Sequence, residues 1–341
     1  MKKLFAILLV LAMLSACVGE KPAEKPLDES PAFSETSTDK FLKDCVYVSL
    51  EGKYGVCCGE EVITEDIYDV YKEIGRVGGM TLYAFGKESG TKPTVLYNED
   101  SHPYAVGETE KILWDIYSDS GEAVLPISVD DAEKYDKETL YTSLEGTLYM
   151  YTFSDEGEII EEEKDPAGKT GEVYNGLEEV RYYYGASPLS VGYGLADAEG
   201  KTVIPAIYTC FTPIFSDRII ADARNGFGMM NAANIYDIEG NLLCEKYHMV
   251  IYKHMNSETN EWLGIGYVAG PESQIESVCR DENGNLMTPG HRFIDKDGNE
   301  LSEVFTDDIK DEISSKEPVM FLTDANGGEM EVNLDDYIFV P

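Results

Sequence analysis

The stretch of sequence that decides the fold is YGLADAEGKTVIPAIY, residues 193–208. It holds an aromatic residue followed by glycine, then Asp197 and Gly200 in an Asp-x-x-Gly order, then two apolar residues before Pro205. Aspartate accepts backbone N–H bonds in an Asx-turn, and glycine takes the positive φ that a short hairpin loop requires. The apolar pair then begins a return strand, and Pro205 is expected to end pairing because it lacks an N–H. The stretch predicts a β-hairpin that is scaffold and not a reaction centre.

Similar stretches recur along the chain at an interval of about 40 residues, which is the signature of a repeat architecture. The glycines of the copies are spaced 36, 43, 40 and 58 residues apart. The residues assigned to the turns are Asp119 and Gly121, Asp155 and Gly157, Asp197 and Gly200, Asp237 and Gly240, and Asp295 and Gly298. Each unit is too small to bury its own apolar face, so we expect neighbouring units to pack on one another.

The continuation of the opening stretch makes a family resemblance specific. Phe211, the sequence PIFS at 213–216 and the strand-like IIA at 219–221 follow it. Together, residues 193–223 resemble the WG-containing (KWG) repeat of bacterial proteins, with Tyr193-Gly194 in place of the usual Trp-Gly. A poorer copy begins with KYGV at 53–56 and lacks the Asp-x-x-Gly. The resemblance, which touches most of residues 45–310, implies a β-rich repeat array on exported or surface proteins; it implies no shared reaction and no catalytic residues.

The fold class that follows is all-β, a repeat array of short antiparallel hairpins. A propeller-like ring is favoured over an open hairpin stack, because a ring has no exposed terminal edges. The β-rich segments 45–48 and 337–340 stand near the two ends and would pair to close such a ring. Only residues 134–143 and 306–315 allow short helices, and neither has a sustained helical period.

The N-terminus, MKKLFAILLVLAMLSAC at residues 1–17, has the layout of a secretory signal peptide. Its apolar run of about 11 residues is shorter than the roughly 20 that span a bilayer. The ending LSAC resembles the bacterial lipoprotein box, which implies that Cys17 becomes the first mature residue and carries a lipid; an ordinary signal peptide with an incidental cysteine is the alternative. Lipid chains hold a soluble domain at a membrane surface. We therefore expect an exported protein, lipid-anchored to the outer face of the bacterial membrane.

Residues 18–40 contain three prolines among Glu, Lys, Ser and Thr and almost nothing to bury. Such a composition does not repay the entropy of ordering, so this segment is expected to be a flexible tether. Residues 41–341 then form the WG-like β-repeat domain. The 65 acidic residues outnumber the 27 basic ones and give a formal net charge of −38 without a Lys/Arg cluster, which excludes nucleic-acid binding and favours a solvated exterior.

Motifs for catalysis and for metal binding are missing from the sequence. It has no Gly-x-Ser-x-Gly, no His-Glu-x-x-His and no Cys-x-x-Cys. The histidines are His102, His248, His254 and His291, and their spacing predicts no metal site. Six cysteines remain beyond Cys17, and export permits disulfides without requiring them in a chain of this length. We expect no catalytic residue and no cofactor.

Calcium is the weaker alternative among cofactors. Two stretches, DKDGN at 295–299 and DENGN at 281–285, cluster hard oxygen ligands of the kind that calcium prefers. In an EF-hand loop the glycine comes at position 6, but here it comes at position 4. The hairpin-turn interpretation explains the same residues without an ion.

The run Tyr182-Tyr183-Tyr184 is the candidate ligand platform. Side chains alternate between the faces of a strand, so either the outer two or the middle one should be buried. Exposed tyrosines are good recognition surfaces because they are large, rigid and amphipathic.

Three functions remain open. The first is a surface-anchored lipoprotein that binds, or acts as a scaffold for, a protein or glycan ligand. The second is an extracellular hydrolase with a carboxylate pair in a central concavity. The third is a structural spacer without a ligand. The sequence favours the first, because it has an anchor, a tether and repeats but no catalytic motif.

Overall fold

The computed structural model describes residues 40–341 except 44, 100, 225–229, 271–272, 274, 276, 282, 310–312 and 314–317. The predicted signal peptide, Cys17 and nearly all of the predicted tether lie outside the described residues. Within the described part the chain is all-β, with strands β1 to β24, a 3₁₀ turn at Leu334–Asp336 and no α-helix. The prediction of an all-β chain of antiparallel hairpins is confirmed.

The strands form seven antiparallel sheets, each made of strands that follow one another along the chain. The first three sheets are β1 (Lys40–Lys43), β2 (Val46–Val48), β3 (Tyr54–Cys58) and β4 (Glu61–Val62); β5 (Val70–Val77), β6 (Met80–Tyr97) and β7 (Pro103–Ser118); and β8 (Asp131–Lys134), β9 (Thr139–Leu144), β10 (Thr147–Phe153) and β11 (Ile159–Asp165). The next two are β12 (Gly168–Tyr174), β13 (Leu177–Tyr183), β14 (Val191–Ala196) and β15 (Thr202–Tyr208); and β16 (Cys210–Ile214), β17 (Arg218–Arg224), β18 (Met230–Asp237) and β19 (Leu242–Tyr247). The last two are β20 (Met249–Asn256), β21 (Glu261–Val268) and β22 (Gly290–Ile294); and β23 (Val319–Thr323) and β24 (Glu329–Asn333).

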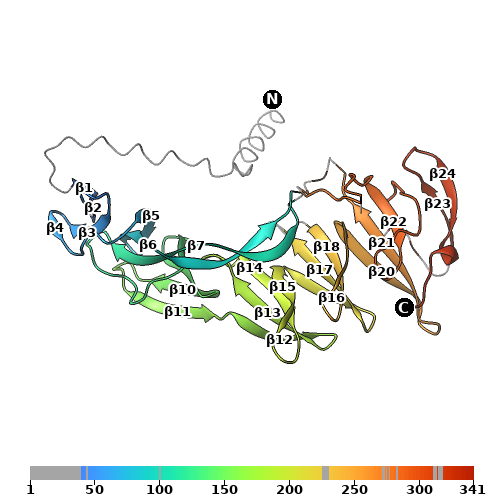
Figure 1. Cartoon of the computed structure of the whole chain (residues 1–341), viewed down its shortest axis with the longest axis horizontal. Coiled ribbons are helices and arrows are strands. Elements are labelled where there is room, and N and C mark those ends of the chain that lie inside the picture. Colours follow the sequence, from blue (N-terminus) through green and yellow to red (C-terminus); the bar gives the residue numbers. More distant parts are fainter. Residues whose placement is uncertain are drawn as a thin grey trace.

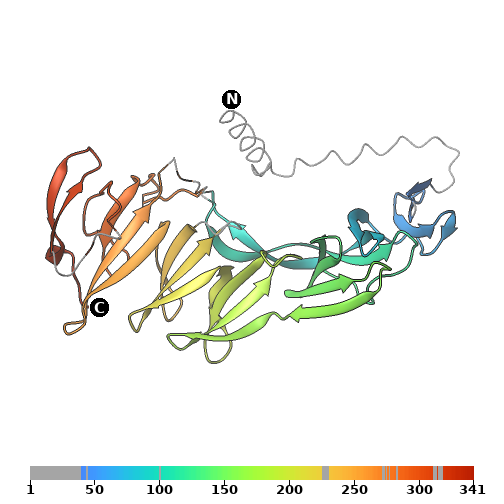
Figure 2. The same cartoon turned by 180° about the vertical axis from the view of Figure 1, so that it is seen from behind.

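The sheets lie in an open row, with β1–β4 at one end and β23–β24 at the other (Figures 1 and 2). The two segments that were expected to close a ring do not meet in the described chain. Strand β2 pairs with β1 and β3, whereas Phe339 pairs with Trp262 of β21. Each segment thus pairs with a strand of its own sheet or of the neighbouring sheet. The described chain forms the open hairpin stack, and the ring that was favoured from the sequence is not seen.

The turn predicted from the opening stretch is present. Gly200 has φ +83° and donates its N–H to the Asp197 carbonyl oxygen at 3.0 Å. The Asp197 side chain accepts the N–H of Lys201 through Oδ1 at 2.8 Å. The same bonds recur at Asp237 with Gly240 and at Asp295 with Gly298. The Asp and Gly assignments of these three turns are confirmed.

Two of the predicted turn aspartates are not the capping residues. Gly121 and Gly157 donate their N–H groups to the carbonyl oxygens of Ser118 and Ser154, at 2.9 and 3.1 Å. Serine takes the position of Asp197 because its hydroxyl also accepts local backbone N–H groups. Asp119 instead accepts the Thr81 N–H at 3.2 Å, and Asp155 follows the capping serine directly. Three further turns of this geometry, at residues 49–52, 98–101 and 324–327, were not found from the sequence.

Pro205 does not end strand pairing, contrary to expectation. It lies inside β15, where the register with β14 skips between the pairs Leu195–Ile204 and Tyr193–Tyr208. The skipped residues form a bulge, and a proline is tolerated there because its missing N–H is not needed for the ladder. A Cβ on Gly194 would lie 2.6 Å from the Ile204 carbonyl oxygen, so the aromatic-Gly pair needs glycine for the close approach of this bulge.

The hydrophobic core is divided among the junctions between sheets. Leu195, Ile204, Ile219 and Ala221 join the β12–β15 sheet to the β16–β19 sheet in one cluster. Ile235 and Cys244 of the β16–β19 sheet join Val250, Val268 and Ile294 of the β20–β22 sheet in another.

Two turn glycines also pack against the neighbouring sheet. A Cβ on Gly240 would lie 2.4 Å from the Val203 carbonyl oxygen, and one on Gly298 would lie 2.6 Å from the Cys244 side chain. Each unit therefore buries its apolar face against its neighbour, as a repeat array requires.

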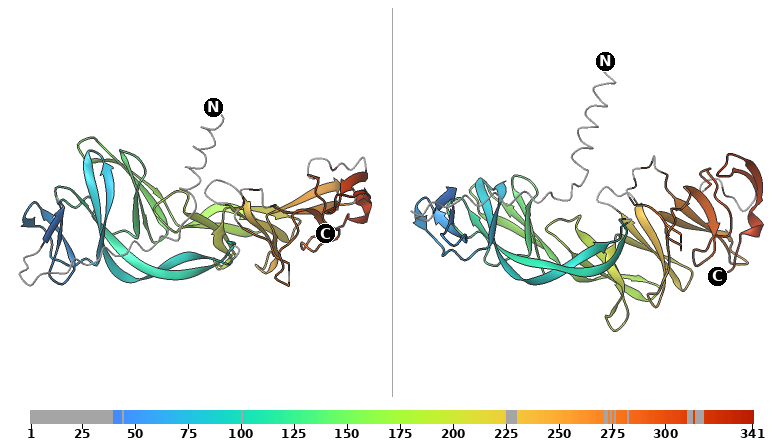
Figure 3. Two further views of the ribbon diagram at one scale, coloured as in Figure 1. Left: turned by 90° about the horizontal axis from the view of Figure 1, so that it is seen from above. Right: turned by 45° about the horizontal axis from the view of Figure 1, so that its top comes forward.

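The longest hairpin, β6–β7, departs from the repeat pattern. It runs along the row as a two-stranded arm, past the β8–β11 and β12–β15 sheets (Figure 3). Val95, in the outer half of the arm, packs against the cluster of the β12–β19 junction. The tip of the arm brings His102 to the β20–β22 sheet.

The two segments that allowed short helices are not helical where they are described. Residues 134–143 contain the end of β8 and most of β9. Asp136 accepts the N–H groups of Glu138 and Thr139 at 2.8 Å, and this turn replaces the expected helix. Part of 306–315 lies outside the described residues, and the described part of it has no helix.

Candidate functional site

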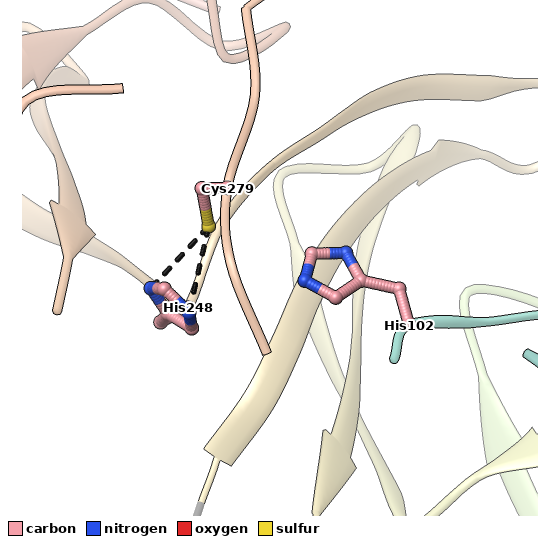
Figure 4. A group of neighbouring side chains, drawn as sticks. All are labelled: His102, His248 and Cys279. Carbon is pink, nitrogen blue, oxygen red and sulfur yellow. Dashed lines mark hydrogen bonds between the residues drawn. The ribbon is translucent and has the colours of Figure 1, made fainter. Parts of the chain in front are cut away.

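The most concentrated group of reactive side chains consists of His102, His248 and Cys279, which we call the His-His-Cys cluster (Figure 4). Its members come from three distant segments: the turn before β7, the link between β19 and β20, and the long connection from β21 to β22. One ligand atom from each, two imidazole nitrogens and the thiol sulfur, lie within 4.8 Å of one another. The three residues are 6%, 1% and 3% exposed. Only tertiary packing brings them together.

Hydrogen bonds fix the ring of His248 and its tautomer. The Ala269 N–H donates to Nδ1 at 3.0 Å, and Nε2 lies 3.0 Å from the carbonyl oxygen of Ser277. An N–H donor faces Nδ1 and an acceptor faces Nε2, so the proton is on Nε2 and the lone pair on Nδ1. Burial lowers the pKa of His248, and its bond to Ser277 partly offsets this. The imidazole is therefore neutral at pH 7.

Cys279 lies over the face of that ring, close to both of its nitrogens. Its sulfur is 3.3 Å from Nδ1 of His248 and 3.7 Å from Nε2 (Figure 4). The ring of His102 stands edge-on to that of His248, with the centroids 6.3 Å apart and an interplanar angle of 74°. A thiol and two imidazoles are thus arranged around one small region of the interior.

His102 is presented by a braced turn. Its N–H donates to the Asn98 side-chain oxygen at 2.9 Å, and the Asn98 N–H donates to the His102 carbonyl oxygen, also at 2.9 Å. Ser101, just before it, has φ +63°, which shows how tightly the chain turns at the tip of the arm. The backbone that carries His102 is therefore held in place by its own loop.

A cavity of about 550 Å³ lies beside the cluster and shares His248 with it. Its other lining residues are Met249, Tyr267, Val268, Gly270, Ile275, Pro289, Gly290, His291, Thr306 and Asp308. The rings of Tyr267 and His291 lie face to face, 4.6 Å apart and tilted by 32°. Asp308 places Oδ1 3.6 Å from Nε2 of His291. The cavity thus combines an aromatic wall with one carboxylate, which suits a small organic ligand.

The predicted tyrosine platform is used for packing. Tyr183 is 6% exposed and its hydroxyl donates to Asp165, so the middle residue is the buried one. The rings of Tyr182 and Tyr184 pack on each other with centroids 4.9 Å apart. Tyr182 covers Gly146, and the Tyr184 hydroxyl donates to the Ala206 carbonyl oxygen at 2.9 Å. The alternation was predicted correctly, but the outer tyrosines are half-buried and occupied by these contacts.

The four histidines lie in different surroundings, which their spacing in the sequence did not predict. His254 is exposed and stacks on Trp262 at 4.5 Å, whereas His291 lies in the cavity wall. His102 and His248 meet although 146 positions separate them in the sequence. No short motif encodes this meeting, so the sequence expectation of no metal site rested on spacing alone. The two ligand types of the cluster, imidazole and thiolate, are those that zinc and soft transition metals take.

The loops that suggested calcium are closed by their own backbone. Asp295 Oδ1 accepts the N–H groups of Asp297 and Asn299 at 2.8 and 2.9 Å. Asp281 Oδ1 accepts those of Asn283 and Asn285 at 2.9 and 2.8 Å. Bonds to Asn285, foremost from its side chain, lower the pKa of Asp281. The hairpin-turn interpretation accounts for these carboxylates.

A hydrolase would need a pair of carboxylates in one cavity, and the two cavities differ in this respect. Asp308 is the single carboxylate among the lining residues of the cavity beside the cluster. Another cavity of about 430 Å³, between β20–β21 and the segments that flank β23–β24, is lined by Glu261 and Asp335 together with Met255, Asn256, Pro318, Leu334 and Ile338. Two acids thus meet at that hollow.

Comparisons with known proteins add little. No family model and no curated protein matches the chain. Hsv2 of Kluyveromyces lactis, with loop 6CD complete, is 12% identical over 57% of this chain and 69% of that chain, with a TM-score of 0.17. A functionally unknown protein from Desulfotomaculum acetoxidans DSM 771 is 11% identical over 86% of this chain and 90% of that chain, with a TM-score of 0.17. Among the described residues, no helix has the length and apolar character to cross a membrane.

Proposed function

We propose that this protein is an exported lipoprotein of the WG-repeat type, anchored through Cys17 to the outer face of the bacterial membrane, that binds a protein or glycan ligand. The layout of residues 1–17 and the proline-rich segment after them support the anchor and the tether. The strong acidic excess supports a role outside nucleic-acid binding. The open row of sheets supplies a long, rigid scaffold for the binding site.

The cavity beside β21 and β22 is the observation that carries the binding role. Its volume of about 550 Å³ falls in the range of ligand sites, roughly 300–1,000 Å³. The ring of Tyr267 offers a face on which a sugar ring or an apolar side chain stacks. Asp308, at the rim with 58% of its side chain exposed, offers an acceptor for hydroxyl or amide donors. The cavity takes one sugar unit of a glycan or one side chain of a partner protein.

A binding screen tests this role. The purified protein is assayed against cell-wall glycans and secreted proteins, and we expect saturable binding to one ligand class. Tyr267→Ala and Asp308→Asn should each weaken that binding at least tenfold, while circular dichroism remains unchanged. Tyr135→Ala is the matched control, because Tyr135 is 68% exposed and lies in a different sheet region. Absence of saturable binding across the screen would favour the structural spacer.

The anchor has a separate test. Cys17→Ala removes the sulfur that would carry the lipid, and we expect the protein to move from the membrane fraction to the soluble fraction. Cys58→Ala, which alters an exposed cysteine in the repeat domain, should leave the distribution unchanged. Membrane association that survives Cys17→Ala would contradict the anchor without bearing on the cavity.

The hydrolase alternative now rests on Glu261 and Asp335, which line the same hollow. Glycoside cleavage needs two carboxyl groups that act as acid and as base or nucleophile. If this alternative holds, Glu261→Gln should abolish turnover of a glycan without weakening its binding. Turnover that persists in Glu261→Gln and in Asp335→Asn would end it.

A further inference from the structure

We propose that His102, His248 and Cys279 bind one zinc ion, which fastens the tip of the β6–β7 arm to the β20–β22 sheet. This site shares His248 with the ligand cavity and is independent of the lipid anchor. The ion would attach the tip of the arm to a sheet far from the one in which the arm starts.

The distances already approach those of a zinc site. With zinc bonds of about 2.3 Å to sulfur and about 2.0 Å to nitrogen, tetrahedral ligand atoms lie roughly 3.3 to 3.6 Å apart. The Cys279 sulfur lies 3.3 Å from Nδ1 of His248, and the whole ligand set falls within 4.8 Å. Closing the set around an ion therefore needs side-chain movements of roughly 1 to 1.5 Å, and the Cys279 sulfur must move from over the His248 ring toward the plane of its Nδ1 lone pair.

One ring nitrogen of His248 is bonded as in a metal-bound histidine, and the other is engaged by a backbone N–H that zinc would have to displace. Its Nε2–H donates to the Ser277 carbonyl oxygen, which leaves Nδ1 as the electron-pair donor, while the Cys279 sulfur lies over the ring near both nitrogens. Such a bond from the second ring nitrogen to a carbonyl oxygen orients most metal-bound histidines. Zinc would take the Nδ1 lone pair that now accepts the Ala269 N–H.

Binding also has a proton balance. The thiol of Cys279 loses its proton to solvent as the zinc–sulfur bond forms, and both histidines bind as neutral rings. The thiolate neutralises one of the two charges of the ion, and the two imidazoles replace part of the hydration that the ion loses on entering a buried site. Three protein ligands leave the fourth position of a tetrahedral ion for water.

The connectivity gives the ion a structural purpose. His102 is in the arm, His248 leads into β20, and Cys279 belongs to the connection between β21 and β22. One ion would therefore cross-link three segments that the chain itself does not hold together locally. Restricting such long loops in the unfolded chain favours the folded state, and so does binding to the folded state alone.

Cobalt substitution of the full-length protein tests the site. The protein is stripped with a chelator and titrated with Co²⁺, and we expect one equivalent to produce a thiolate-to-cobalt charge-transfer band that Zn²⁺ then removes. Cys279→Ser should abolish the band, and His102→Ala should weaken zinc binding by roughly 10–100-fold or more. Cys58→Ser and His254→Ala are matched controls, because both side chains are exposed, and they should keep the band.

Hydrogen exchange tests whether zinc holds the tip of the β6–β7 arm in place. Zinc should slow exchange of the Asn98 and His102 amides in the wild type and in Cys58→Ser, but not in Cys279→Ser. Thermal melts of the metal-free variants show whether each is folded. A band that survives Cys279→Ser in a folded protein, or is lost with Cys58→Ser, overturns the site. Binding of Cu⁺ with no binding of Zn²⁺ overturns the assignment of the metal.

Discussion

The two junctions on either side of the β16–β19 sheet are built differently. At the junction with β12–β15, apolar side chains such as Leu195 and Ile219 come from consecutive repeat units, and the hydroxyls of Tyr208 and Tyr236 bond to each other at 2.6 Å. At the junction with β20–β22, the apolar cluster also includes Cys279 from the long connection after β21. Beyond it lies His248, with the arm residue His102 facing it. The first junction is thus assembled by neighbours along the chain, whereas the second collects distant segments.

This difference shows that a degenerate repeat tolerates a longer connection between two of its hairpins. The interval between turn glycines rises from 40 residues, between Gly200 and Gly240, to 58 residues, between Gly240 and Gly298. The additional length includes the connection that carries Ser277 and Cys279. The turn itself is unchanged, since Gly298 keeps φ +84°. The longer connection therefore adds the thiol of the His-His-Cys cluster while the hairpin turn keeps its geometry.

The largest expected effect is at the core of the first junction. Ile219→Ala should lower the free energy of unfolding by about 2–5 kcal/mol, because Ile219 is fully buried and the cavity left behind cannot collapse completely. The measurement is denaturant unfolding, done with and without zinc. The cost should be the same in both, since this junction does not include the His-His-Cys cluster. Ile160→Ala, at a position 65% exposed, is the control and should change the stability by less than about 0.5 kcal/mol. A cost that depends on zinc would mean that the two junctions are coupled.

The turn glycines should give the next largest effect. Gly200→Val should cost about 1–3 kcal/mol through its positive φ alone, because a Cβ there meets nothing within 4 Å. Gly240→Val should cost more, since its φ is +86° and the Cβ would lie 2.4 Å from the Val203 carbonyl oxygen of the neighbouring sheet. Thermal and denaturant melts give the loss of stability in each variant. The difference between the two losses measures how much the packing of the Gly240 turn on the neighbouring sheet contributes. Equal costs would show that the Gly240 turn is not tightly docked.

The smallest effect is expected at the exposed turn aspartate. Asp197→Asn keeps an oxygen that accepts the Lys201 N–H, so it should change the stability by less than about 0.5 kcal/mol. Asp197→Ala loses that bond and should cost about 0.5–1.5 kcal/mol. If Asp197→Asn abolished a measured binding activity in a stably folded protein, this turn would not be scaffold alone.

The parts of the fold that could be predicted are those fixed by a few consecutive residues. The Asp and Gly positions of three turns and the all-β class follow from local backbone chemistry. The alternation along residues 182–184 does so too, although local chemistry left open which face would be buried. The bulge at Pro205 was not predicted, because it depends on the close approach of Gly194 across the sheet. The open row was only the less favoured of the two predicted arrangements, because whether distant ends meet depends on the accumulated geometry of every junction.

The candidate site shows the same limit more strongly. A search by spacing looks for ligands within one short segment, but the members of the His-His-Cys cluster are separated by 146 and 31 positions. Their meeting depends on the length of the β6–β7 arm, and no pattern near His102 specifies where the arm ends. Tyr267, His291 and Asp308 likewise line one cavity only because β21, β22 and the segment after them lie side by side.

The arm also sets an order of events in folding. Strands β6 and β7 are synthesised well before the sheet on which their tip lies, so the arm waits without its final contacts until the last third of the chain has been made. Pairings between residues so far apart in sequence are slow to form, and they leave apolar surface uncovered meanwhile. The outer half of this hairpin should therefore be the last part to become protected during refolding, and the first part to open when the native protein is stressed.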